Sequence, residues 1–241
     1  MESSLRASPW WYRRRDAVFG LIYGAGFFAG GTYSGTVYHA YVPLYVQAAE
    51  RFGGTAGLVV VALMFALMAT CLAVRVWGSS YLHARIVWSE DARTDSLVVA
   101  GPFRFTRNPL YFGNMLMAAS FGGFAPLSGW IVLNALNAAF VLALIRWEEP
   151  GLRARYGAQF ERYCATVPPL FPRLVPAAQS GTAQPSLAEG LKSEIFVGSL
   201  FAGMIALFVL PPLAGWCTFG ALYIAGITVQ QAVARSSGRE Q

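Results

Sequence analysis

The fold is decided by the stretch Phe52–Val74, FGGTAGLVVVALMFALMATCLAV, which contains no charged residue. As a helix it is about 35 Å long, enough to cross a bilayer core roughly 30 Å thick. Three further runs lack Asp, Glu, Lys and Arg: Ala17–Ala49, Asn108–Ile145 and Ile195–Ala234. The first of them fits one crossing, and the other two are each long enough for a helical hairpin. The sequence therefore predicts an all-α, polytopic membrane protein with about six transmembrane helices.

The composition of the whole chain agrees with this prediction. Of 241 residues, 56% are hydrophobic and only 12% are charged, and the mean hydropathy is +0.46. A soluble domain usually carries about twice that share of charged residues. These values exclude a disordered protein, a coiled coil and most soluble globular folds.

The arginines predict the orientation in the membrane. They gather in the N-terminal arm, after the second and fourth predicted helices and in the C-terminal tail, whereas Arg51 is the exception in the intervening turns. Basic loops face the cytoplasm, so we expect both termini there. The net charge of +6 is then explained by topology and contact with anionic lipid, and no nucleic-acid partner is needed. The basic start followed by a long apolar run is interpreted as an uncleaved first helix.

The expected domain organisation follows the apolar runs and the breakers inside them. It comprises a cytoplasmic arm (1–15), helices one and two (16–74), a central core with a cytoplasmic loop and helices three and four (75–174), a linker (175–193) and a terminal transmembrane hairpin with a tail (194–241). The expected helices span Asp16–Val42, Thr55–Trp77, Asn108 to Gly122-Gly123, Leu127–Trp147, Glu194–Leu210 and Leu213–Ala234, with a cytoplasmic amphipathic segment over Gly151–Leu174. Helix three has about 14 residues and is short for a full crossing. Glycines of helix one, such as Gly20, Gly24 and Gly26, favour close helix packing within the chain over a dimer interface.

Cysteine and histidine do not form a recognisable site in the sequence. Cys71, Cys164 and Cys217 show no paired spacing, and His39 and His83 are isolated. We therefore expect neither a disulfide framework nor a metal site.

The first candidate for chemistry is the segment Gly101–Gly113, GPFRFTRNPLYFG. Asn108 is a favoured N-cap and Pro109 is favoured at the first helical position, so helix three begins here. Free N–H groups at a helix start attract anions, and Arg104 and Arg107 add donors suited to a carboxylate. The alternative is an ordinary interfacial turn with snorkelling arginines.

The second candidate is Arg146-Trp147-Glu148-Glu149 at the expected end of helix four. Carboxylates are costly at the end of an apolar helix unless water, a cation or a partner satisfies them. Either one faces a ligand, or both belong to a solvated helix end paired with Arg146, Arg153 or Arg155. Because helices three and four form a hairpin, both candidates lie at the same membrane face. A helix start that binds anions beside two carboxylates suits a zwitterionic ligand.

These residues resemble a known signature. The run Leu97–Gly113, with the distal Glu148-Glu149, Leu152, Tyr156-Gly157, Phe160, Tyr163 and Val167-Pro168, is similar to the isoprenylcysteine carboxyl methyltransferase and phospholipid methyltransferase superfamily. The resemblance covers roughly 75–173. In the isoprenylcysteine branch a histidine usually stands at the position of Asn108, which weakens the assignment of a prenylcysteine substrate.

The resemblance implies S-adenosyl-L-methionine bound on the cytoplasmic side and a lipophilic substrate that arrives from the bilayer. The residues carried over as cofactor-binding are Gly101, Pro102, Arg104, Arg107, Asn108, Pro109, Tyr111, Glu148 and Glu149. We expect Glu149 to accept a proton from an amine or thiol acceptor, and Arg146 to orient an acidic one.

The sequence thus predicts an integral membrane methyltransferase dependent on S-adenosylmethionine (EC 2.1.1 class), acting on a lipophilic or small thiol, amine or carboxylate substrate. Seventeen of the eighteen basic residues are arginine, which favours a bacterial inner membrane as the location. One alternative is a membrane reductase with a nicotinamide cofactor. Another is a transporter or scaffold without enzymatic activity.

Overall fold

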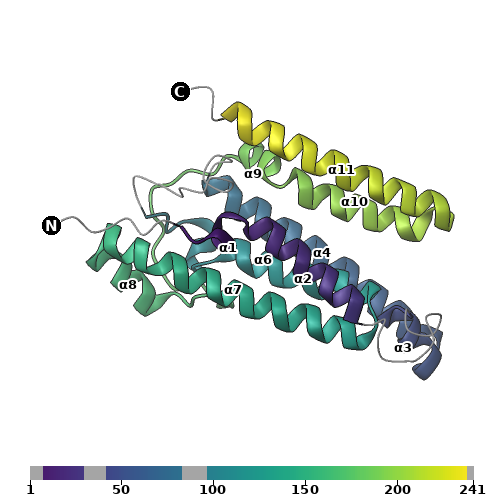
Figure 1. The fold of residues 1–241 in the computed structure, drawn as a ribbon. Coiled ribbons are helices and arrows are strands. Elements are labelled where there is room, and N and C mark those ends of the chain that lie inside the picture. The colour runs from purple at the N-terminus through teal and green to yellow at the C-terminus, as the bar shows by residue number, and fades with distance from the viewer. Residues whose placement is uncertain (1–7, 30–41, 83–96, 238–241) are drawn as a thin grey trace. The chain divides into compact units, whose positions relative to one another are not determined.

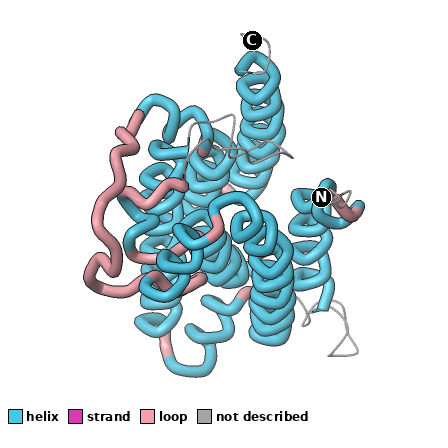
Figure 2. The backbone as a smooth tube through the Cα atoms, turned by 90° about the vertical axis from the view of Figure 1, so that its left-hand side faces the viewer, coloured by secondary structure: helices cyan, strands magenta, loops and turns pink. Residues whose placement is uncertain are grey.

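The computed structural model describes residues 8–29, 42–82 and 97–237. These residues form helices joined by loops, with no strand among them (Figure 2). The chain divides into two compact units, one of residues 1–65 and 117–148 and the other of residues 66–116 and 149–241.

The first unit holds α1 (Trp10–Arg13), α2 (Arg15–Ala29), α3 (Leu44–Phe52), the 3-10 helix η2 (Gly122–Phe124), the start of α4 (Gly54–Leu82) and the larger part of α7 (Leu127–Tyr156). Helix α2 packs closely on α7, because a Cβ atom added at Gly26 would lie 2.6 Å from the Cβ of Leu133. Ile22 and Leu133 share a buried cluster with Ala118. The expected packing of a helix-one glycine inside the chain is confirmed at Gly26, whereas Gly20 and Gly24 have open space around them.

The second unit holds the end of α4, the 3-10 helix η1 (Gly101–Arg104), most of α6 (Pro109–Phe121) and the end of α7. It also holds α8 (Ala158–Thr166), α9 (Leu187–Ser193), α10 (Ile195–Val209) and α11 (Pro212–Ser237). Helices α10 and α11 lie side by side as a hairpin (Figures 1 and 2). The hairpin is tightly packed, since a Cβ at Gly203 would meet the ring of Phe219 at 2.7 Å.

A buried ion pair links three helices of the second unit. Arg75 of α4 donates through Nε to Glu194 at 2.6 Å, and Nη1 donates to Asn114 of α6 at 2.6 Å. Ser79 donates to the other oxygen of Glu194 at 2.7 Å. Glu194, directly before α10, has a fully buried side chain, so its charge depends on these partners.

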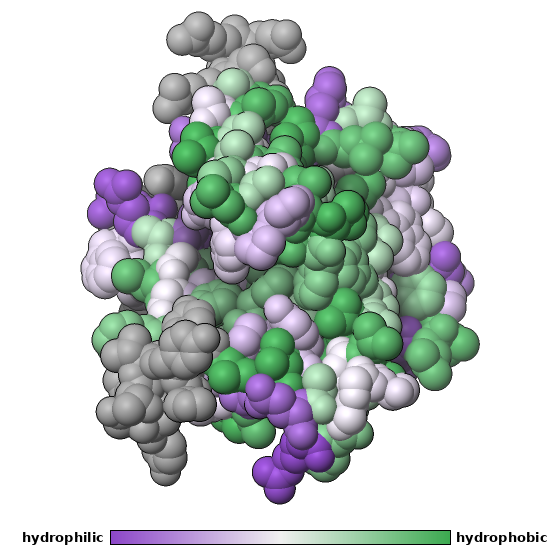
Figure 3. Space-filling view, turned by 90° about the vertical axis from the view of Figure 1, so that its right-hand side faces the viewer, coloured by the Kyte–Doolittle hydropathy of each residue, from purple (hydrophilic) through white to green (hydrophobic). Residues whose placement is uncertain are grey.

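Within the part of the chain that the structure describes, three helices are long and apolar enough to cross a membrane: Gly54–Leu82, Leu127–Tyr156 and Pro212–Val233. A fourth span results if α9 and α10, bent by 65°, are counted as one. Large apolar side chains on α11 are exposed, among them Leu213, Trp216 and Ile224. Hydrophobic side chains also cover much of the surface that faces the viewer in Figure 3. The described helices confirm an all-α, polytopic membrane fold with three to four candidate spans, and the expected count of six stays a prediction.

Several expected helix boundaries were wrong. Helix four does not end at Trp147 but continues through Pro150 to Tyr156, and the break comes at Gly157, whose φ is +48°. Pro150 removes only one backbone hydrogen-bond donor from the helix, and α7 continues through it. A positive φ is readily adopted by glycine alone, so Gly157 ends the helix. The expected amphipathic segment, Gly151–Leu174, is helical over the end of α7, to Tyr156, and over α8, Ala158–Thr166.

The ends of the chain also differ from expectation. The expected first helix, Asp16–Val42, is helical over its described first part, where α2 begins one residue earlier at Arg15 and runs to Ala29. Residues 30–41 of it lie outside the described residues, as do both histidines. Helix α3, which was not expected, begins inside the charge-free run Ala17–Ala49 and continues beyond it to Phe52. Part of the expected linker forms α9, whose N-cap Ser186 accepts a hydrogen bond from the backbone of Glu189.

Candidate functional site

Two distant segments of the second unit are joined by backbone hydrogen bonds. The N–H groups of Gly181, Ala177 and Arg173 donate to the carbonyls of Val99, Arg104 and Phe105, at 2.7, 2.8 and 3.0 Å. In the other direction, the N–H of Arg107 donates to Pro168 at 2.9 Å. The loop after α8 is therefore fixed along the segment before α6. We call this joined region, residues 99–108 and 167–181, the paired segments.

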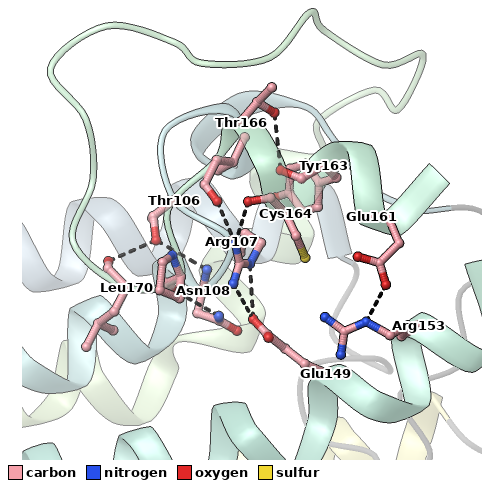
Figure 4. A network of polar contacts seen from close by, with 12 residues as sticks. Thr106, Arg107, Asn108, Glu149, Arg153, Glu161, Tyr163, Cys164, Thr166 and Leu170 are labelled. Carbon is pink, nitrogen blue, oxygen red and sulfur yellow. Dashed lines mark hydrogen bonds and ion pairs between the residues drawn. The ribbon is translucent and has the colours of Figure 1, made fainter. Parts of the chain in front are cut away.

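Arg107 is the centre of the side-chain network (Figure 4). Its Nε and Nη2 donate to one oxygen of Glu149, at 3.1 and 2.6 Å. Its Nη1 donates to the carbonyls of Cys164 and Val167, at 3.2 and 2.7 Å. The side chains of Arg107 and Glu149 are only 11% and 20% exposed, so the pair is shielded from solvent. The guanidinium thus connects α7, α8 and the start of α6.

Glu149 uses one carboxylate oxygen for this contact. Both hydrogen bonds from Arg107 end on Oε1, and Oε2 has no hydrogen bond with any residue that the structure describes. Because α7 continues to Tyr156, Glu148 and Glu149 lie inside the helix, contrary to the expected helix end. Oε2 of Glu149 can therefore accept a further donor.

Asn108 stands directly before α6, as the sequence predicted, and Pro109 is the first residue of that helix. Its Nδ2 donates to the carbonyl of Pro169 at 2.7 Å, and its backbone N–H donates to Thr106 Oγ1 at 3.3 Å. Thr106 in turn donates to the carbonyl of Leu170 at 2.8 Å. Within the described chain Oδ1 of Asn108 accepts no hydrogen bond, so the expected side-chain cap is not formed. Asn108 instead fixes the loop, with its amide oxygen available.

An apolar cluster lies beside this network. Phe160, Tyr163 and Val167 are buried and pack with residues of both paired segments, Val99 and Ala177 among them. The hydroxyl of Tyr163 donates to the carbonyl of Phe103 at 2.7 Å. Burial raises the pKa of this phenol above its usual value, although the charge of Arg107 opposes the shift.

Cys164 packs against the same apolar cluster. Burial also raises the pKa of its thiol, again against the charge of Arg107.

Other predicted site residues are held by packing. Gly101 has φ +54°, and a Cβ there would lie 2.2 Å from the ring of Tyr81, so only glycine fits. Pro102 and Pro109 are buried, and Tyr111 is half-buried. Arg104 Nε donates to the carbonyl of Ala178 at 2.9 Å.

Glu148 and Arg146 belong to the first unit. The hydroxyl of Tyr12 donates to Glu148 Oε1 at 3.0 Å. The side chain of Arg146 is exposed and forms no hydrogen bond or ion pair with a described residue. The structure therefore brings together Arg107, Asn108 and Glu149 within the second unit.

The sequence did not predict Thr106, Cys164 and the carbonyls of the loop after α8 as parts of this network. Tyr163 and Val167-Pro168 entered only as elements of the motif. A backbone acceptor leaves no signal in the sequence, because every residue carries one.

Comparisons with known proteins agree with the location of this network. Residues 87–159 match the phospholipid methyltransferase family. The cobalt-zinc-cadmium resistance protein CzcN of Cupriavidus metallidurans is 32% identical over 103 residues, which is 42% of this chain and 43% of that protein. The nickel-cobalt-cadmium resistance protein NccN of Alcaligenes xylosoxydans xylosoxydans is 28% identical over 120 residues, 50% of this chain and 52% of that protein.

The chain thus spans about half the length of the curated relatives that it matches. No solved structure matches significantly. The described residues hold no group of three or more His, Cys, Asp or Glu that could bind a metal ion. The family match includes Arg107, Asn108 and Glu149. It confirms over residues 87–159 the resemblance to the phospholipid methyltransferase family and its isoprenylcysteine carboxyl methyltransferase-like superfamily, and so supports a membrane methyltransferase in general.

Proposed function

We propose that this chain is an integral membrane methyltransferase that uses S-adenosyl-L-methionine and acts on a lipophilic or small thiol, amine or carboxylate acceptor. The observation that carries the proposal is the shielded contact between Arg107 and Glu149. It joins the two distant parts of the family signature inside the matched segment. Arg107, which also donates to two backbone carbonyls, fixes Oε1 of Glu149 and leaves Oε2 available.

The available groups fit the chemistry of this cofactor. S-adenosylmethionine carries an ammonium group, a sulfonium, ribose hydroxyls and a carboxylate. Oε2 of Glu149 and Oδ1 of Asn108 are acceptors without a described partner, and both suit a cation or a hydroxyl. The terminal nitrogens of Arg104, also without a described partner, suit a carboxylate. The second unit thus offers hydrogen-bond acceptors and a guanidinium cation, which together match the opposite charges of a zwitterionic ligand.

In this proposal the chain mainly binds and orients the cofactor and the acceptor, and proton transfer is a smaller part of its role. The bound cofactor supplies an electrophilic methyl group. Arg107 holds the carboxylate of Glu149 in one orientation, and this positioning contributes most where the reaction needs alignment. Glu149 accepts the proton of an amine or thiol acceptor, while Arg146 orients an acidic one. The remaining proposed cofactor residues are Gly101, Pro102, Pro109, Tyr111 and Glu148.

The proposed acceptor reaches the site from the bilayer, and the proposed setting is a bacterial inner membrane with the site and both termini in the cytoplasm. The printed names of the two relatives concern metal resistance. Lipid extracts from bacteria grown under cobalt, nickel or cadmium stress are therefore useful material in which to search for the acceptor.

The test uses the full chain in lipid nanodiscs. Calorimetry with S-adenosylmethionine should show binding, and labelled methyl groups should enter a component of a total lipid or thiol extract. Glu149→Gln and Asn108→Ala should lower the affinity by about tenfold or more, because each removes an acceptor. Glu161→Gln is the matched control, since Glu161 forms an exposed pair with Arg153 on neighbouring helices.

Two outcomes would overturn the proposal. Wild-type protein that neither binds the cofactor nor transfers methyl groups to any extract would contradict the activity. Wild-type affinity in Glu149→Gln and Asn108→Ala would contradict the site. Binding of a reduced nicotinamide cofactor in the same calorimeter would instead favour the membrane reductase.

A further inference from the structure

The loop after α8 exposes apolar side chains beside the candidate site. Residues Leu170–Pro176 read LFPRLVP, and we call them the apolar loop. Phe171 and Val175 are each 67% exposed, and Leu174 is 100% exposed. Leu170 points the other way and is buried. A contiguous exposed apolar group of this kind marks an interaction surface.

This exposure does not come from a loose loop. Thr106 Oγ1 donates to the carbonyl of Leu170, and the N–H of Arg173 donates to Phe105. The N–H of Ala177, just beyond the loop, donates to Arg104. The ring of Phe171 also meets that of Phe112 edge-on, with 6.4 Å between their centroids. The loop is therefore held in one conformation that presents its apolar side chains outward.

The apolar loop lies where a bilayer surface is expected. It belongs to the connection between α8 and α9, which runs outside the helices in Figure 2. In the second unit, the end of α4, the start of α10 and the end of α11 lie at the same end as α8 and α9 (Figure 1). These are ends of candidate membrane spans, so the boundary of the bilayer is at this level.

We propose that the apolar loop inserts Phe171, Leu174 and Val175 into the boundary between the headgroups and acyl chains of the bilayer. The exposed Arg173 lies at the level of anionic headgroups. Exposed aromatic and aliphatic side chains with one cation are the composition of segments that lie in a membrane interface. Because the loop is bonded to residues 104–106, this insertion brings the paired segments to the membrane surface, within reach of a lipid-borne molecule. The inference holds whatever reaction the site performs.

Fluorescence quenching tests the insertion. Leu174→Cys and Gln184→Cys are made in a Cys164→Ser/Cys217→Ser background, with the buried Cys71 retained, and are labelled with an environment-sensitive dye. Gln184 is the matched control, because it is an exposed polar residue of the same connection. Each full-length protein is placed in nanodiscs of phosphatidylcholine with or without phosphatidylglycerol. Doxyl-labelled lipid and aqueous iodide are the two quenchers.

At position 174, iodide quenching should be about fivefold weaker than at 184, and doxyl lipid should quench strongly. Arg173→Glu should weaken the doxyl quenching most in nanodiscs with phosphatidylglycerol, since it repels the anionic headgroups. Equal iodide quenching at 174 and 184, with no effect of doxyl lipid, would overturn the proposal. So would a shielded label that is insensitive to doxyl lipid and self-quenches on addition of more labelled protein, because the loop would then contact a second copy.

Discussion

At the scale of single residues, Arg107 has the largest set of contacts in the candidate site. Arg107→Ala should destabilise the protein by about 2–4 kcal/mol, because Glu149 and two carbonyls lose a shielded cation. Thermal unfolding in detergent measures the change. Arg153→Ala is the control: its pair with Glu161 is exposed and should contribute nothing measurable. Equal melting temperatures for the two variants would contradict a structural role for the Arg107 contact.

Tyr163 gives a prediction about pH. Its raised pKa means that the folded state retains the phenol proton while the unfolded chain releases it near pH 10. The contribution of Tyr163 to stability is therefore complete below about pH 10 and is lost progressively as the pH rises above it. Unfolding midpoints between pH 8 and pH 11 should fall more steeply for wild type than for Tyr163→Phe. At pH 8 this variant should be less stable by about 1–2 kcal/mol, since the carbonyl of Phe103 loses its donor. If wild type and Tyr163→Phe lost the same stability at alkaline pH, the loss could not be assigned to Tyr163.

At the scale of elements, the break between α7 and α8 depends on Gly157. Its φ of +48° with ψ of −127° is open almost only to glycine, so Gly157→Ala should cost about 1–3 kcal/mol. Gly151→Ala is the matched change inside α7, where a Cβ meets open space, and it should stabilise by about 0.5–1 kcal/mol. Melting temperatures of the two variants should move in opposite directions. A shift of the same sign in both would contradict glycine as the helix terminator.

The Arg75–Glu194 pair provides the prediction for the contacts among α4, α6 and α10. Arg75→Met should destabilise by about 3–5 kcal/mol, because it leaves a buried carboxylate without its cation. The double variant Arg75→Met/Glu194→Met should recover at least half of that loss, since no charge is left buried. A double-mutant cycle in denaturant measures the coupling energy. Additive losses would show that the two side chains contribute independently.

The helices were predictable from the sequence to different degrees. The start of α6 at Pro109 was found, because Asn-Pro carries a local signal at a helix start. The end of α7 was missed, because a proline was weighed above a glycine whose φ could not be known. Helix α9 was missed inside a stretch of Pro, Ala, Ser and Gln, although its Ser186 cap is a local signal. Contacts through backbone carbonyls, such as those of Arg107, have no sequence pattern at all.

At the scale of the whole molecule, the class of the protein followed from the absence of charge over long runs. The count of six spans stays a prediction, because among the described helices α6 has 13 residues and α2 has 15, fewer than a straight crossing needs. A charge-free run shows that a segment can enter a bilayer, but not whether one helix or two bent pieces fill it.

The orientation of the chain remains a prediction at this scale. With the basic segments in the cytoplasm, a C-terminal fusion to green fluorescent protein should fluoresce and a fusion to alkaline phosphatase should be inactive in a bacterial host. Fusions after α3, near Gly53, should give the reverse result, since that connection is expected outside. Matching signals at both positions would contradict the proposed topology.

The paired segments have a consequence for how such a protein can change over time. Four main-chain amides fasten the two segments to each other, together with side-chain donors of residues 104–108. In residues 167–181 each of these bonds uses a main-chain group. Substitutions there can therefore alter the outward surface while the scaffold below keeps its shape. Under the proposed function, a framework of this kind would allow one methyl acceptor to be exchanged for another while residues 99–108 stay unchanged.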